Sequence, residues 1–170
     1  MLYFLANNKK GFHCGGVLIS ERYVLTASHC VNGKDIPTTW QLTGVRLGEW
    51  DTTTENDCDD SFVNEKVCAP PAIDIQIEQL IPHENYQPSA GNQHNDIALL
   101  RLAQPVTFSE FVAPICLPFE SAARDNNFVN QTLSVAGWGL LKNNTMLNLI
   151  IKFLFLSITQ ERLKVSQQVT

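Results

Sequence analysis

Residues 12–31, FHCGGVLISERYVLTASHCV, determine how the rest of the chain is interpreted. A β-prone run at 23–27 leads to His29, which directly precedes Cys30, and a second cysteine, Cys14, lies near the start of the stretch. A disulfide between Cys14 and Cys30 would close a loop of about 15 residues and restrict the unfolded chain by roughly 3 kcal/mol. His29 would then lie on an immobile turn, which suits a general base, because proton transfer needs the imidazole within hydrogen-bond reach of its partner.

A second motif, NDIALLRL, lies at 95–102 and places Asp96 at the mouth of an apolar run. Burying a carboxylate is costly unless another group pairs with it. A catalytic histidine is a partner of this kind, because the carboxylate holds the imidazole in one tautomer and stabilises the imidazolium. The plainer alternatives are that Asp96 caps a turn and that His29 is an ordinary histidine beside a structural disulfide.

Three motifs together resemble those of the chymotrypsin-like serine proteases. CGG at 14–16 followed by TASHC at 26–30 resembles the histidine box, NDIALLRL resembles the aspartate box, and VAGWG at 135–139 is similar to the segment that leads into the second barrel. Ser28 stands where most members carry alanine, a variant that resembles the arthropod clip-domain proteases. His29 precedes Asp96 by 67 residues, against about 45 in chymotrypsin, and an acidic insertion between them is of the size to account for the difference.

The resemblance implies an all-β fold, comprising the first antiparallel β-barrel of a two-barrel protease and the start of the second. Short β-prone runs separated by turn residues independently favour an all-β architecture. Ile73, Ile75 and Ile77 alternate with polar residues, which predicts a half-buried strand, whereas the nearly continuous apolar run at 97–102 predicts burial on both faces. The expected strands are 17–20, 23–27, 42–47, 73–77 and 97–102.

The insertion at 48–71 is polar, and its segment 49–60 carries six acidic residues and no basic one. Carboxylates at this density repel one another, so the loop needs open solvent or a cation such as Ca²⁺, which prefers oxygen ligands. In trypsin-like proteases the corresponding loop binds calcium, and the resemblance places Glu49 at its first carboxylate ligand. Two hypotheses stay open: a calcium site that includes Glu49, or a solvated acidic loop closed by a Cys58–Cys68 disulfide. No cofactor is required for the expected chemistry.

Cys116, within PICLP at 114–118, is the odd one of five cysteines once Cys14 pairs with Cys30 and Cys58 with Cys68. The resemblance implies that Cys116 forms an interchain disulfide with a clip-bearing light chain. The alternative is a free buried thiol.

Several features indicate a secreted protein that does not bind nucleic acid. Cysteine pairs and glycosylation sequons at Asn130 and Asn143 favour an oxidising, extracellular compartment. The first residues do not form a signal peptide, so we expect the signal and the clip domain outside this sequence. The net charge of −5 and the absence of a basic run exclude an electrostatic footprint for nucleic acid.

The end of the chain departs from the family pattern, which predicts a partial peptidase domain at 1–139 and a non-family tail at 140–170. Residues 146–158 form an apolar stretch of 13 residues, whereas a helix needs about 20 to span a bilayer, so no membrane anchor is expected. We interpret the tail as a translated intron or a mis-joined exon.

The resemblance implies a serine endopeptidase of an extracellular cascade, such as melanisation or Toll activation, with a protein substrate that is a zymogen or a cytokine precursor. His29 would be the general base and Asp96 its orienting carboxylate. The nucleophilic serine is expected about 93 residues after Asp96, beyond residue 170, and no serine here has a Gly-x-Ser-x-Gly setting. The chain alone should therefore be inactive. The alternative is a non-catalytic homologue that acts as a binding or regulatory module.

Overall fold

The computed structural model describes residues 1–6, 9–59, 67–89 and 94–119. Several sequence predictions lie outside these residues: the sequons at Asn130 and Asn143, the motif at 135–139 and the tail at 140–170. Within the part that the structure describes, no helix has the length and apolar character needed to cross a bilayer.

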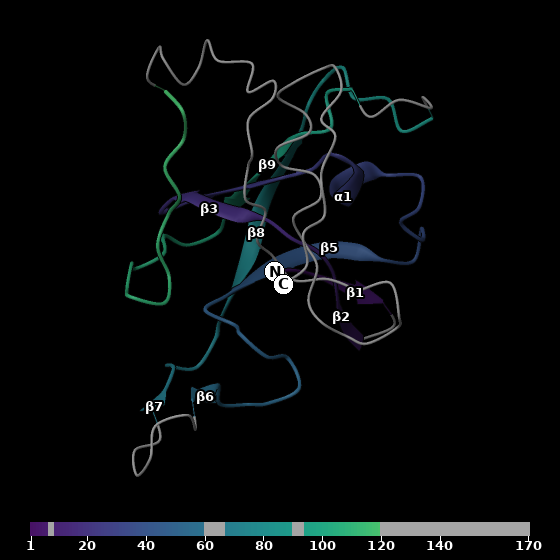
Figure 1. Ribbon diagram of the computed structural model, residues 1–170. Coiled ribbons are helices and arrows are strands. Elements are labelled where there is room, and N and C mark those ends of the chain that lie inside the picture. Colours follow the sequence, from purple (N-terminus) through teal and green to yellow (C-terminus); the bar gives the residue numbers. More distant parts are fainter. Residues whose placement is uncertain (7–8, 60–66, 90–93, 120–170) are drawn as a thin grey trace, which may run out of the picture.

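Seven strands form one sheet, and almost every other described segment is a turn or loop (Figure 1). The order across the sheet is β2-β1-β5-β8-β9-β4-β3, and each neighbouring pair is antiparallel. Two further short strands, β6 (Cys58–Asp59) and β7 (Val67–Cys68), pair with each other at the end of the acidic insertion. The strands of the sheet are β1 (Leu2–Ala6), β2 (Lys9–Cys14), β3 (Val17–Ser20), β4 (Tyr23–Thr26), β5 (Gln41–Leu47), β8 (Ile73–Pro82) and β9 (Ala98–Leu102).

The sheet curls because its two edge strands, β2 and β3, are consecutive in the chain. Only Gly15 and Gly16 separate Cys14 at the end of β2 from Val17 at the start of β3. The link passes close to β4, since a Cβ on Gly16 would lie 2.7 Å from the Val24 side chain and 3.0 Å from the Leu25 carbonyl oxygen. Contacts this close leave room for glycine alone. The result is the curled antiparallel half-barrel that the sequence predicts.

The core lies inside this curl. It contains Leu2, Phe4, Leu18, Val24, Val45, Ile75, Leu100 and Leu102, each at most 9% exposed. The strand expected at 97–102 is present as β9, but the prediction that both its faces are buried is wrong. Its residues alternate, with Leu100 and Leu102 fully buried and Arg101 between them half-buried. The outer face of an antiparallel sheet can meet water, which explains the alternation.

Strand β8 is longer than the 73–77 prediction and serves two neighbours in turn. Its first part pairs with β5, at Ile73 to Gln76, and its second part pairs with β9, up to Pro82. Ile75 joins the core at 9% exposure, whereas Ile73, at the strand's start, is 43% exposed. The period of two is therefore correct, but Ile73 lies beyond the part of the face that the core covers.

Candidate active site

Strand pairing brings the histidine and aspartate motifs to the same end of the sheet. β4 ends at Thr26, which lies opposite Ala98, the first residue of β9. Because the two strands are antiparallel, the residues that follow β4 lie beside those that precede β9. His29 comes three residues after Thr26, and Asp96 two residues before Ala98. Residues 67 positions apart in the sequence thus become neighbours.

One helical turn, α1 (His29–Asn32), fixes the backbone of His29. Backbone hydrogen bonds from Cys30 to Ala27 and from Val31 to Ser28, at 3.1 and 2.9 Å, close the turn. Cys30 also forms a disulfide with Cys14, and its side chain is almost completely buried. The histidine is therefore held from both sides, by the turn and by a covalent bond to the end of β2.

Asp96 holds His29 through both of its carboxylate oxygens. Oδ1 accepts a hydrogen bond from the His29 backbone N–H at 2.8 Å, and Oδ2 lies 2.7 Å from Nδ1 of the imidazole. Asp96 is 4% exposed, whereas the side chain of His29 is 35% exposed. The contact to Oδ2 makes Nδ1 the protonated nitrogen and leaves Nε2 as the basic one. Nε2, which lies 3.5 Å from the Cys30 sulfur, is then the ring nitrogen that can take a proton from a neighbouring group.

The loop before β9 aims Asp96 inward through an unusual backbone conformation at Asn95. Asn95 has a φ of 60°, and its side-chain amide donates to the Asn85 carbonyl oxygen at 3.2 Å. Asparagine is among the few residues that adopt this left-handed conformation readily. Asn95 was not predicted to have a role of its own, although an asparagine directly before a candidate catalytic aspartate is the signal that would have identified it.

Tyr86 lies near enough to Asp96 for its phenol to respond to the charge of the carboxylate. Burial raises the pKa of its phenol, and the negative charges of Asp96 and Asp35 raise that pKa further. The phenol therefore stays neutral and adds no negative charge beside Asp96.

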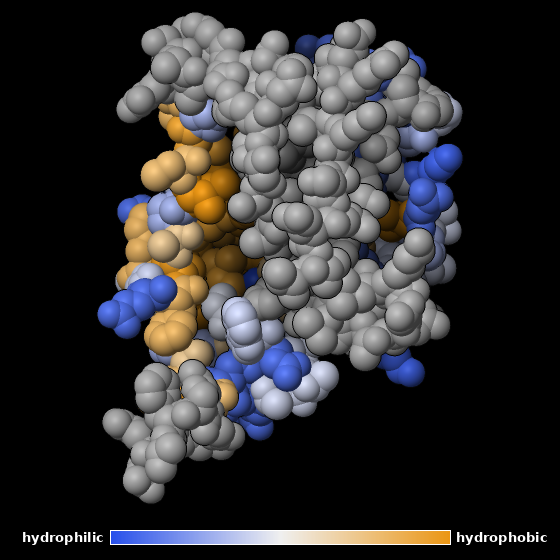
Figure 2. Space-filling view, in the orientation of Figure 1, coloured by the Kyte–Doolittle hydropathy of each residue, from blue (hydrophilic) through white to orange (hydrophobic). Residues whose placement is uncertain are grey.

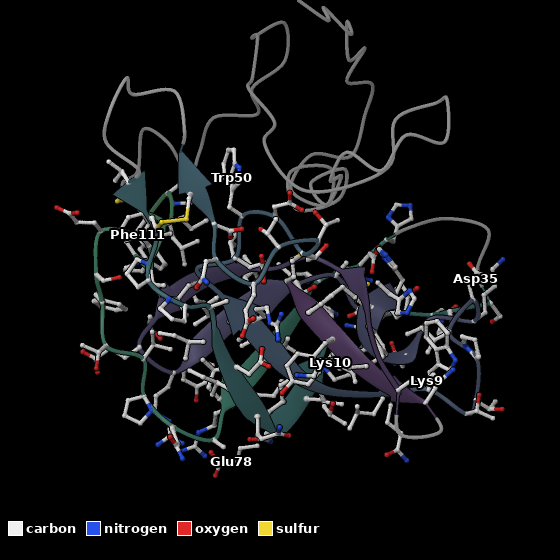
Figure 3. The ribbon with its side chains drawn as sticks, turned by 90° about the horizontal axis from the view of Figure 1, so that it is seen from below. Lys9, Lys10, Asp35, Trp50, Glu78 and Phe111 are labelled. Carbon is white, nitrogen blue, oxygen red and sulfur yellow. A yellow bond between two sulfur atoms is a disulfide. The ribbon has the colours of Figure 1, made fainter. Side chains whose placement is uncertain are left out.

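The acidic loop presents its carboxylates in a different way. Asp57 accepts hydrogen bonds from the backbone N–H groups of Trp50 and Asp51, at 2.6 and 3.1 Å, and from the Thr54 hydroxyl at 2.8 Å. Burial opposes ionisation of Asp57, but these hydrogen bonds outweigh it and lower the pKa of the carboxyl. Trp50 is 68% exposed, and its indole points away from the sheet (Figure 3). Asp57 therefore serves as a hydrogen-bond acceptor inside its own turn.

Glu49, the expected first calcium ligand, lies against a guanidinium. Its Oε2 is 3.2 Å from Nη1 of Arg46, and its side chain is only 6% exposed. Arg46 also forms a bidentate pair with Asp74, at 2.8 and 2.9 Å. The hydrogen bond to Arg46 is the main cause that lowers the pKa of Asp74 to about 2, and it raises the pKa of Arg46. A cation of the protein already neutralises the carboxylate that calcium would use.

Whether the acidic loop binds calcium stays a prediction. Among the described residues, the one group of three or more side chains whose ligand atoms lie close enough for a metal ion consists of Cys14, His29 and Cys30. The two sulfur atoms of that group form a disulfide and are not available as thiolates. The second disulfide, between Cys58 and Cys68, closes the β6–β7 hairpin as the solvated-loop hypothesis requires.

Cys116 is the one cysteine of the chain without a disulfide, and it is exposed. The alternative of a buried free thiol is therefore wrong. Apolar side chains surround it in sequence, with Phe111 50% exposed, Ile115 45% and Phe119 78%. The space-filling view shows apolar surface on the side where residues 104–119 run (Figure 2).

A curled antiparallel sheet that holds a histidine against a buried aspartate at one end defines the first barrel of a trypsin-like fold. The chain belongs to the trypsin family, whose family model, described as Trypsin, matches residues 2–169. This match extends beyond residue 139, where the sequence predicts the end of the peptidase domain, so that boundary stays a prediction.

Insect clip-domain serine proteases are prominent among the relatives. The chain is 55% identical over 150 residues to "Serine protease ea" of Drosophila melanogaster, covering 88% of this chain and 38% of that protein. It is 54% identical over 129 residues to "CLIP domain-containing serine protease HP8" of Bombyx mori, covering 76% and 34%. It thus spans little more than a third of the length of these curated relatives.

Two further matches connect the chain to cascade proteases. The "Spaetzle-processing enzyme" of Drosophila melanogaster is 47% identical over 133 residues, covering 78% of this chain and 33% of that protein. The crystal structure of the Drosophila Grass clip serine protease of the Toll pathway is similar with a TM-score of 0.64 at 39% identity, covering 74% of this chain and 34% of that one.

Proposed function

We propose that this chain supplies the general base and the orienting carboxylate of a secreted, trypsin-like serine endopeptidase. The observation that carries the proposal is the 2.7 Å contact between His29 Nδ1 and a carboxylate oxygen of Asp96 that water barely reaches. In such a pair the basic Nε2 removes a proton from the nucleophile, and the carboxylate stabilises the imidazolium that forms. Asp96 does not take the proton itself.

The nucleophile is the component that the 170 residues do not supply, because none of their serines stands in a Gly-x-Ser-x-Gly setting. We propose that the chain is part of a longer enzyme and does not hydrolyse peptide bonds alone. The genomic sequence downstream is then expected to encode Gly-Asp-Ser-Gly-Gly. Residues 140–170, which we propose to derive from an intron or a mis-joined exon, would then lie between the peptidase domain at 1–139 and the downstream serine motif.

A fluorophosphonate reagent that modifies activated serines provides the test. The 170-residue chain should remain unlabelled, whereas a form extended by the downstream coding sequence should be labelled and should cleave peptide amides. Replacing His29 with alanine in the extended form should abolish labelling. Labelling of the 170-residue chain itself would contradict the proposal.

The absence of that serine setting also supports a second candidate, a non-catalytic homologue that binds or regulates other proteins. A secreted product that ends at Thr170 and whose downstream sequence encodes no serine motif would favour it. In that case neither form should react with the reagent.

We further propose a cascade role with a protein substrate, either a zymogen or a cytokine precursor. Support comes from the similarity to a protease named for processing Spaetzle and to one of the Toll pathway. Secretion and glycosylation at Asn130 and Asn143 belong to the same proposal. Incubating the extended enzyme with candidate precursors and sequencing the new termini tests it, and intact precursors would contradict it.

Cys116 is proposed to hold a clip-bearing light chain through an interchain disulfide. Its exposed thiol and the adjacent apolar side chains of Phe111 and Ile115 support this role. On non-reducing gels the activated protein should migrate as one species and separate into two after reduction. Cys116→Ser should give two species without reduction; if it does not, the linkage lies elsewhere.

A further inference from the structure

A buried hydroxyl beside the catalytic pair has no role in the mechanism so far described. Ser28 is fully buried at 0% exposure. Its Oγ donates a hydrogen bond to the Ile97 carbonyl oxygen at 2.6 Å and accepts one from the His83 backbone N–H at 3.1 Å. The hydroxyl therefore uses both its donor and an acceptor within the protein.

These two bonds join three segments that end at the candidate site. Ser28 directly precedes His29, Ile97 directly follows Asp96, and His83 directly follows the end of β8. The Ser28–Ile97 bond thus ties together the two backbones from which the imidazole and the carboxylate extend. His83 fixes both backbones to the neighbouring strand.

We propose that Ser28 is a positioning residue that sets the separation of His29 and Asp96, an inference that rests on the proposed function of this pair. The bidentate contact of Asp96 needs its two oxygens to face the His29 N–H and the imidazole at the same time. A shift of either backbone by a fraction of an ångström breaks one of the two contacts, because hydrogen bonds weaken steeply with distance and angle. A hydroxyl that links the adjacent residues resists this shift.

The matched control is Thr26, which carries another buried hydroxyl two residues earlier. Thr26 is 1% exposed, and its Oγ1 donates to the Gly15 carbonyl oxygen at 2.6 Å. This bond holds β4 to the β2–β3 link and does not involve the Asp96 loop. Thr26→Val and Ser28→Ala both remove a buried hydroxyl, but only Ser28→Ala removes a tie between His29 and Asp96.

Ser28→Ala should not leave an orphaned N–H group. The His83 N–H also donates to the Ile97 carbonyl oxygen, at 3.0 Å, and this bond remains in the variant. The substitution removes one oxygen atom and adds no volume. We therefore expect the variant to fold but to hold the side chains of His29 and Asp96 with less precision.

Nuclear magnetic resonance on the oxidised protein measures that precision without relying on activity. Two signals are followed: hydrogen exchange of the His29 backbone amide, and the low-field proton of His29 Nδ1 that faces Asp96. Ser28→Ala should accelerate exchange of the amide about tenfold, which corresponds to one hydrogen bond, and should broaden the Nδ1 proton. Thr26→Val should leave both signals as they are in the unmodified protein.

Different results separate the failure of this inference from the failure of the proposed function. An unchanged amide and Nδ1 proton in a folded Ser28→Ala variant would overturn the positioning role. Absence of a low-field Nδ1 proton in the unmodified protein would instead overturn the His29–Asp96 pair. If the alanine variant does not fold, Ser28→Thr and Ser28→Val repeat the test, because threonine and valine have nearly the same volume. Ser28→Thr should retain the two signals and Ser28→Val should lose them. Equal behaviour of these two variants would overturn the inference.

Discussion

The site around Asp96 and the acidic loop at 49–59 both depend on carboxylates, but the carboxylates have different partners in the two regions. Asp96 is buried, and its two oxygens both face one residue, His29. Asp57 is surrounded by the N–H groups and hydroxyl of its own turn, and Glu49 by the guanidinium of Arg46. Asp96 therefore binds a residue that is distant in the sequence, whereas the carboxylates of the loop mostly bind groups that are near them in the sequence. Density of acidic residues is therefore a poorer guide to chemistry than the origin of their partners.

Substitution of Asp96 should show the largest difference between the two regions. Asp96→Asn should lower kcat of a form that carries the nucleophile by about 10⁴-fold, because an amide no longer holds the imidazole in the required tautomer. Hydrolysis of a peptide substrate measures the effect. Asp57→Asn is the matched control and should leave kcat unchanged. A comparable loss in both variants would mean that the loop, too, acts on the chemistry.

The two disulfides provide the next largest contrast. Replacing Cys14 and Cys30 with alanine should lower the free energy of unfolding by about 3 kcal/mol, since the bond closes 16 residues of chain. Replacing Cys58 and Cys68 should cost less, because a two-strand hairpin can open locally without global unfolding. Urea denaturation gives both values. Equal losses would show that the hairpin unfolds together with the sheet.

We expect the Arg46–Asp74 ion pair to make a smaller contribution to the free energy of unfolding, and one that depends on pH. The pKa of Asp74 is about 2 in the folded protein against an ordinary 3.8, so its stabilising contribution is complete above about pH 4 and is lost as the pH falls through 2. Since Asp74 is partly exposed, we expect Asp74→Asn to cost about 1 kcal/mol at pH 7. Urea denaturation should show a smaller difference in the free energy of unfolding between the variant and the unmodified protein at pH 2.5 than at pH 7.

A control for the ion pair is available on the same strand. Glu78 pairs with Arg22 at 2.8 Å, but the Glu78 side chain is 44% exposed. Glu78→Gln should therefore lower the free energy of unfolding at pH 7 by less than Asp74→Asn does, because exposed ion pairs contribute little. Equal losses would contradict the larger contribution assigned to the Arg46–Asp74 pair.

The smallest expected effect is that of calcium. Because Glu49 already faces Arg46, millimolar calcium should leave the Tm unchanged. A site with a Kd of about 10⁻⁴ M would add about 2.7 kcal/mol at 10 mM calcium. A saturable rise in Tm would contradict this expectation and support the calcium hypothesis. Magnesium at the same concentration is the control for ionic strength.

Local pattern predicted five of the seven strands of the sheet, and β1 (Leu2–Ala6) and β2 (Lys9–Cys14) were not among the expected strands. The runs at 17–20 and 42–47 correspond closely to β3 and to β5. The sequence did not distinguish β9 from a strand buried on both faces, because an apolar run contains no information about which side meets water. Ile73 is exposed for a related reason, since the extent of the core depends on how the sheet curls.

The candidate pair was predictable because each residue stands in a motif. His29 follows a cysteine-flanked β run, and Asp96 precedes an apolar one. Ser28 was not predictable as a contributor, because its effect depends on a hydroxyl that meets a distant carbonyl. Asn95 had a signal in the sequence, its place directly before Asp96, but the left-handed backbone that gives it a role is visible only in the structure. The contact between Arg46 and Glu49 was not predicted either, because the acidic segment spans residues 49–60 and Arg46 precedes it.

The register between β4 and β9 also sets an order of events during synthesis. The Cys14–Cys30 bond needs only the first 30 residues of this sequence, whereas the partner of His29 is translated 67 residues later. Oxidation can therefore secure the imidazole long before its carboxylate exists. In the nascent chain the imidazole can thus be anchored before its carboxylate partner is made, and the pair forms only when a late, non-local strand docks.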